Sequence, residues 1–144
     1  MRCQFCSSED TRVVNKRDGD GFVRRRRECL KCKKRFTTYE RADIEIVVIK
    51  KDGRREQFNR EKLRGGIVKA CEKRDISHER IDKMLNDIEE RLRRQGKEIK
   101  SDFIGKMVMQ RLKGLDKVAY IRFASVYQDF QDVQDFKKQI KELE

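Results

Sequence analysis

Residues 22–36 read Phe22-Val-Arg-Arg-Arg-Arg-Glu-Cys-Leu-Lys-Cys-Lys-Lys-Arg-Phe36, and this stretch decides how the amino-terminal part of the chain folds. It places a Cys-x-x-Cys turn, Cys29 and Cys32, directly after four consecutive arginines. A second turn of the same kind, Cys3 and Cys6, lies near the start. Two such turns supply four soft thiolates, the ligand set of tetrahedral structural zinc. We therefore predict one Zn²⁺ per chain, held by these four cysteines.

Two other uses of the cysteines stay open at this point, a pair of redox disulfides and an iron–sulfur cluster. Four protein ligands leave no open position on a zinc ion for a catalytic water. We therefore expect the metal to be structural, and we expect no catalytic residues around it.

The composition describes a small and strongly basic protein. The chain has 144 residues and a net charge of +12, and 44% of its residues are charged. That length favours one or two domains with a modest core. No segment has the length of a membrane-spanning helix, and no apolar signal segment opens the chain. We expect a cytoplasmic protein without membrane partners, in which cysteines serve as thiols or metal ligands.

Residues 1–44 carry a large share of the positive charge. They hold 13 basic and 7 acidic residues, a net charge of +6. A high positive charge attracts polyanions and speeds their capture, although it also serves solubility alone. Four adjacent arginines beside a metal site favour nucleic acid as the partner.

The segments around the cysteine turns are predicted to form a three-stranded antiparallel sheet. Residues 11–17 and 22–28 have the composition of strands, and 18–21, Asp-Gly-Asp-Gly, form a turn between them. Residues 35–39 supply the third strand. Because side chains alternate along a strand, Arg24 and Arg26 point to one face and Arg25 and Arg27 to the other. We expect one pair to face DNA and the other to meet acidic residues, a flanking loop or a second subunit.

Arginine suits DNA recognition because its planar fork matches phosphate oxygens and the edge of guanine. The candidate DNA-binding residues are Arg17, Arg24, Arg25, Arg26, Arg27, Lys33 and Arg35.

The remainder of the chain is predicted to be a β-hairpin packed on four helices, so the fold class is α+β. Residues 44–50 and 55–58 are the strands of the hairpin, and an Asp-Gly turn joins them. Four polar residues are placed to cap helices: Asn59, Ser77, Ser101 and Asp116. The first helix should reach Lys73, the second should end at Gly96, and the fourth should be one long helix to Ile140. We divide the chain into domains at 1–44 and 45–139, with 140–144 as a tail.

The hairpin is strongly cationic, since Lys50, Lys51, Arg54 and Arg55 surround its turn and Lys62 follows one helical turn later. Several cations that converge beside a glycine can bind a triphosphate. A solvated basic turn would have the same sequence, so this pattern alone leaves both interpretations open. It is not a GxxxxGK[ST] loop.

Several motifs together closely resemble those of the NrdR family, the bacterial repressors of ribonucleotide reductase genes. They are the two Cys-x-x-Cys turns, Arg24-Arg-Arg-Arg-Glu-Cys29, Arg35-Phe-Thr-Thr-Tyr-Glu40, the segment from Lys50 to Phe58, and Val118-Ala-Tyr-Ile-Arg-Phe-Ala-Ser-Val-Tyr127. The likeness covers nearly the whole chain. Gln4 and Lys100 depart from it, because the family usually has proline at both positions.

The resemblance implies a zinc ribbon that binds paired operator boxes in double-stranded DNA, followed by an ATP-cone that senses nucleotides. ATP and dATP would act as allosteric effectors that change the homo-oligomeric state. The resemblance also implies the nucleotide-binding residues, to which the cationic turn adds Arg54. The full set is Val48, Lys50, Lys51, Asp52, Gly53, Arg54, Glu56, Phe58 and Lys62.

Two rival functions remain to be weighed. A general nucleic-acid accessory protein with a zinc ribbon would bind DNA or RNA whatever nucleotide is present. An enzyme, such as a nucleotide hydrolase or a reductase fragment, would need a carboxylate cluster, a nucleophile with its base, or an open metal site. The sequence offers none of these, so we predict that the chain is not an enzyme.

Overall fold

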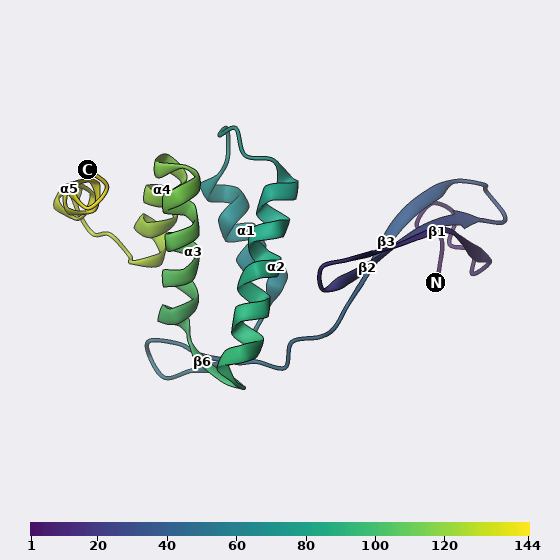
Figure 1. Cartoon of the computed structure of the whole chain (residues 1–144), viewed down its shortest axis with the longest axis horizontal. Coiled ribbons are helices and arrows are strands. Elements are labelled where there is room, and N and C mark those ends of the chain that lie inside the picture. The colour runs from purple at the N-terminus through teal and green to yellow at the C-terminus, as the bar shows by residue number, and fades with distance from the viewer. The chain divides into compact units, whose positions relative to one another are not determined.

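The computed structural model describes all residues from Met1 to Glu144 and divides into two compact units. The first unit comprises Met1–Asp43 and the second comprises Ile44–Glu144 (Figure 1). The first is built of strands and turns, and the second combines a small sheet with helices. The predicted α+β class is therefore confirmed. None of the helices is both long and apolar enough to span a bilayer.

The first unit is a three-stranded antiparallel sheet in the order β1-β2-β3. Its strands are β1 (Thr11–Gly19), β2 (Phe22–Cys29) and β3 (Arg35–Arg41). The turn between β1 and β2 contains Gly21, whose φ of 74° favours glycine. The register of β1 against β2 shifts between Val13 and Asn15, because Val14 forms a β-bulge. The predicted three-stranded ribbon is confirmed, and the bulge is an addition to it.

The second unit contains a three-stranded sheet in the order β5-β4-β6. Its strands are β4 (Val47–Ile49), β5 (Arg55–Gln57) and β6 (Glu98–Lys100). The prediction of a strand over 44–50 was too long, since only three residues pair. The prediction also lacked β6, which pairs in parallel with β4. The hairpin is thus one side of a sheet that a distant segment completes.

Five helices accompany this sheet, where four were predicted. They are α1 (Arg60–Ala70), α2 (His78–Gln95), α3 (Ser101–Leu115), α4 (Lys117–Tyr127) and α5 (Val133–Lys141). Helix α1 packs against α2 and α4, α3 packs against α2 and α4, and α5 contacts α4. Asn59, Ser77 and Asp116 cap α1, α2 and α4 as predicted, each accepting a backbone N–H.

Three helix boundaries differ from the prediction. The first helix ends at Ala70, not at Lys73. Ser101 is the first residue of α3 and does not cap it, because the strand before it brings Lys100 to the cap position. The single long helix expected from Asp116 to Ile140 is two helices, α4 and α5. Asp129 has a φ of 54° in the break, and the side chain of Asp132 caps α5.

The second unit has an apolar core and the first has almost none. Leu85, Leu92, Val108 and Leu112 are fully buried among the side chains of α2 and α3. In the first unit the only buried apolar residues are Cys3, Cys29 and Phe36, with Cys6 and Cys32 packed beside them. The first unit therefore depends on its cysteines for a stable fold, whereas the second has a hydrophobic core of its own.

Candidate functional site

Each cysteine pair lies in a tight turn with the same backbone pattern. The Ser7 N–H donates to the carbonyl of Cys3 at 2.8 Å, and the Lys33 N–H donates to that of Cys29 at 3.0 Å. Ser7 and Lys33, each the residue after the second cysteine of its pair, have φ values of 60° and 61°. The two turns are therefore equivalent halves of one site.

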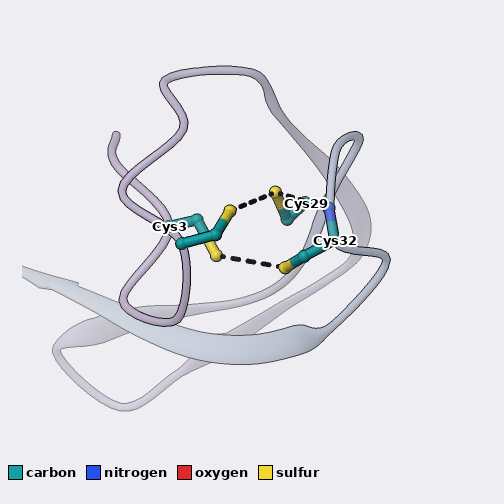
Figure 2. A group of neighbouring side chains, drawn as sticks. Cys3, Cys29 and Cys32 are labelled. Carbon is teal, nitrogen blue, oxygen red and sulfur yellow. Dashed lines mark hydrogen bonds between the residues drawn. The ribbon is translucent and has the colours of Figure 1, made fainter.

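The four sulfur atoms lie together, all within 4.8 Å of one another. The Sγ atoms of Cys3 and Cys32 are 3.7 Å apart (Figure 2). Those of Cys6 and Cys29 are 3.6 Å apart. Four sulfurs at a zinc–sulfur distance of ~2.3 Å in a tetrahedron are separated by ~3.8 Å. The donor set and its spacing fit one zinc ion. All five cysteines are free thiols, so neither pair forms a disulfide.

The acid–base character of the cluster also suits a cation. The backbone N–H of Cys32 donates to Cys29 Sγ at 3.4 Å and is the main reason that the pKa of Cys29 falls to about 6. For Cys32 the Lys34 N–H favours the thiolate, but burial and the neighbouring sulfurs outweigh it and raise the pKa to about 11. Four thiolates this close repel one another unless a cation lies between them.

One face of the first sheet carries most of its arginines. Cross-strand partners share a face, so the registers place the residues in rows. The face, which we call the basic face, contains Arg12, Glu28 and Arg35 in one row, Asn15, Arg26 and Thr37 in the next, then Arg17, Arg24 and Tyr39, and finally Phe22 and Arg41. Arg26 Nη1 donates to Thr37 Oγ1 at 2.9 Å. Six arginines and a single carboxylate therefore share this surface.

The opposite face is more nearly neutral. It carries Arg25 and Arg27 from β2, and Arg25 forms an ion pair with Glu40. Arg27 Nε donates to Thr38 Oγ1 at 3.3 Å. The seven predicted DNA-binding residues are thus divided: Arg17, Arg24, Arg26 and Arg35 lie on the basic face, Arg25 and Arg27 lie on the other face, and Lys33 lies in the second cysteine turn. The prediction did not include Arg12 or Arg41.

A pocket of about 770 Å³ lies in the second unit, within the size range of small-molecule sites. Strands β4 and β5 and helices α1, α3 and α4 line it. Five of the nine predicted nucleotide-binding residues are in the lining: Val48, Lys50, Glu56, Phe58 and Lys62. Residues that the prediction lacked include Lys69, Ser101, Arg122 and Phe123.

Positive charge predominates among the charged lining residues, since Glu56 is the only acid beside Lys50, Lys62, Lys69 and Arg122. The Oε2 atom of Glu56 lies 3.7 Å from Lys50 Nζ and 3.6 Å from Lys62 Nζ. The carboxylate therefore neutralises both lysines only in part. A polyanion that enters the pocket would find four cations and one competing carboxylate.

The other four predicted residues form the tip of the hairpin and do not line the pocket. Arg54 binds Asp52 through its backbone N–H and its Nε, at 3.0 and 2.6 Å. Gly53 has a φ of 85°, which the turn requires. The Nζ atom of Lys51 lies 5.4 Å from the ring centre of Tyr127, which is a pocket residue, so Lys51 borders the pocket.

Helix α4 supplies an aromatic wall and a cation. The rings of Phe123 and Tyr127 stack at 5.9 Å. Burial, helped by the Asp102 carboxylate, raises the pKa of Tyr127, so its hydroxyl stays protonated and donates to the Ser101 carbonyl at 3.0 Å. Arg122 Nη1 donates to the Glu72 carbonyl at 2.6 Å, which fixes that guanidinium beside the end of α1.

Two family models match the chain, one in each unit. The family model described as "Transcriptional repressor NrdR-like, N-terminal domain" matches residues 1–40, and the model described as "ATP cone domain" matches residues 46–133. The chain belongs to the NrdR family.

NrdR proteins of several bacteria align with nearly the full chain. A relative from Clostridium perfringens strain SM101 is 51% identical, and the alignment covers 99% of both chains. Relatives from Thermotoga neapolitana and Kosmotoga olearia are 52% and 54% identical over 99% of this chain, and the alignments cover 94% and 93% of theirs. All three are named transcriptional repressors. The prediction of a non-enzymatic regulator is confirmed.

The family assignment indicates which kind of ligand to expect at each of the two sites. The four-cysteine cluster lies in an NrdR-type zinc ribbon and could hold one metal ion, and the pocket lies in an ATP-cone, a nucleotide-binding domain. Zinc and an adenine nucleotide are therefore the ligands to consider, as the sequence predicted.

Removing the metal should unfold the first unit alone. We expect Cys29→Ser to lose stoichiometric zinc and to make residues 1–43 sensitive to proteases, because that unit has no other core. The helical circular-dichroism signal of the second unit should remain. Cys71→Ala, which alters the fifth and buried cysteine, is the matched control and should keep one zinc per chain. A first unit that stays protease-resistant without metal would contradict this prediction.

Proposed function

We propose that the protein represses ribonucleotide reductase genes by binding paired operator boxes through its zinc ribbon, under the control of ATP and dATP. In this proposal residues 1–44 bind DNA, residues 45–139 sense the nucleotide, and residues 140–144 are a tail. The observation that carries it is that one chain combines a metal-pinned basic face with a cation-lined pocket in an ATP-cone. Such a repressor works in the cytoplasm and associates with the nucleoid when it is bound to DNA.

The basic face is the surface we assign to DNA. Arg17, Arg24, Arg26 and Arg35 lie on it, and their guanidinium groups can bind phosphates or guanine. Arg25 is less suited, because it lies on the opposite face, where it pairs with Glu40 and its side chain is only 28% exposed. Each phosphate contact releases condensed counterions, so binding should weaken steeply as salt rises.

The pocket is the site we assign to the nucleotide. Lys50 and Lys62 both form their ion pair with Glu56. They can bind phosphate oxygens once that carboxylate moves aside. Lys69 and Arg122 add positive charge to the same lining. The apolar and aromatic residues Val48, Phe58 and Phe123 offer surfaces on which an adenine base can lie.

We propose that the nucleotide acts through the number of ribbons that bind together. An effector shifts an equilibrium between assemblies only by its difference in affinity for them. Two ribbons held in one assembly bind paired boxes far more tightly than one, because the second binds at a high effective concentration. ATP and dATP can therefore switch repression without altering a single DNA contact.

The molecular mass in solution tests this proposal. We expect zinc-loaded protein to show different masses with ATP and with dATP, and only one of those forms should bind paired boxes tightly. Single boxes should show a much smaller difference between the nucleotides, because they engage one ribbon. One mass and one operator affinity with every nucleotide would favour the rival accessory protein that ignores nucleotides.

Replacing arginines on the two faces of β2 separates their roles. We expect the double variant Arg24→Ala and Arg26→Ala to lose roughly 2–4 kcal/mol of operator binding, and the salt slope per ribbon to fall by about 2. The matched control, Arg25→Ala with Arg27→Ala, removes the same charge from the opposite face and should have a much smaller effect. Both proteins should keep their nucleotide affinity. Equal losses in the two variants would show that DNA does not bind the basic face.

Replacing one pocket lysine should weaken nucleotide binding alone. We expect Lys62→Ala to reduce ATP and dATP affinity by about 10- to 100-fold, which is the range for losing one charge-assisted contact to phosphate. Zinc content should not change. The control is Lys83→Ala, an exposed lysine of α2 outside the pocket, and calorimetry with each nucleotide provides the measurement. Equal affinities in the two variants would remove Lys62 from the site.

A further inference from the structure

We infer that Glu28 is a positioning residue for DNA binding, which fixes Arg12 and Arg35 on the basic face before DNA arrives. Arg12 thereby joins the residues that contact DNA. The inference rests on the proposed function of that face, and it concerns the one carboxylate found there.

The three residues form a row across the whole sheet. Glu28 lies on the central strand, directly opposite Arg12 on β1 and Arg35 on β3. Both Nε and Nη2 of Arg12 donate to Glu28 Oε1, at 3.1 and 2.7 Å. Arg35 Nε donates to the other oxygen, Oε2, at 3.0 Å. Each carboxylate oxygen therefore holds one arginine.

The exposure of the three side chains shows which of them can meet DNA. The side chain of Glu28 is only 11% exposed, whereas those of Arg12 and Arg35 are 62% and 58% exposed. The carboxylate is covered and the guanidinium groups are accessible. The contacts with Glu28 leave Nη1 of Arg12 and both Nη atoms of Arg35 as donors for a phosphate or a base edge.

A covered carboxylate on a DNA-binding face has two opposing effects. Its charge repels the phosphates, so its removal alone should strengthen binding to any DNA. Its two hydrogen-bonded arginines, however, are already ordered, and an ordered side chain loses less entropy when it binds. If Glu28 positions the arginines, its loss should weaken binding to the operator, where geometry matters. The sign of the change therefore distinguishes the two effects.

The test is Glu28→Gln, which keeps the shape and removes the charge. A glutamine has one acceptor oxygen, so it cannot hold both arginines as the carboxylate does. We expect operator affinity to fall roughly tenfold and affinity for random-sequence DNA to stay equal or rise. The matched control is Glu40→Gln, which makes the same change at the partner of Arg25 on the opposite face. It should leave the ratio of operator to random-sequence binding unchanged.

Two further measurements separate positioning from a structural role. A ribbon that merely loosens would lose zinc and would bind both DNAs less well, and that result would overturn the inference. Adding Glu28→Gln to a protein that already carries Arg12→Ala and Arg35→Ala should have little further effect on operator affinity, since Glu28 acts through those residues. An undiminished loss in that background would also overturn it.

Failure of this inference is distinguishable from failure of the proposed function. If Glu28→Gln raises operator affinity while the variant lacking Arg24 and Arg26 still loses it, the face binds DNA and Glu28 is only a repulsive charge. If neither variant changes DNA binding, the basic face itself is not the DNA surface.

Discussion

The crowding of four thiols is the constraint on which the first unit depends. Its sulfur atoms lie within 4.8 Å of one another, and Phe36 is the only other buried apolar residue there. So small an apolar cluster cannot hold three strands in one register, and the close sulfurs need a cation to remain as thiolates. A metal ion held by the four sulfurs would therefore replace a hydrophobic core. By anchoring Cys29, it would also help to hold the register of β2, the strand that ends there and carries the arginines.

That register converts a run of like charges into two different surfaces. Four adjacent arginines would repel one another on a single surface. Alternation along β2 divides them between two faces. The neighbouring strands supply different partners to the arginines on the two faces. Glu40 binds Arg25 on one face, whereas Arg24 on the other lies between Arg17 and Tyr39 and has no acidic cross-strand partner. The charge available to a polyanion is thus set by cross-strand pairing as much as by composition.

The sequence predicts what depends on local patterns and misses what depends on distant contacts. The paired cysteines and the caps at Asn59, Ser77 and Asp116 are local signals, and the structure confirms those caps and brings the four sulfurs together. Strand β6 forms only because β4 offers it a free edge, so its three residues carry no sufficient signal of their own.

Arg12 was missed for a related reason. It and Arg17 are five residues apart and would face opposite sides of a regular strand, but the bulge at Val14 brings them to the same face. Arg122 reaches the pocket from α4 through tertiary packing alone.

The placement of the two sites restricts how one can control the other. Every pocket residue lies between Val48 and Tyr127, and every residue of the basic face lies between Arg12 and Arg41. The two sets belong to different compact units, so a nucleotide in the pocket and DNA on the basic face, as we propose them, would share no side chain. In the control that we propose, the influence of the nucleotide passes through contacts between chains. The pocket suits this route, because its lining joins the hairpin to α1, α3 and α4. A ligand that drew these elements together would change the surface that the helical unit offers to another chain. Control through assembly would therefore need no rearrangement of the zinc ribbon.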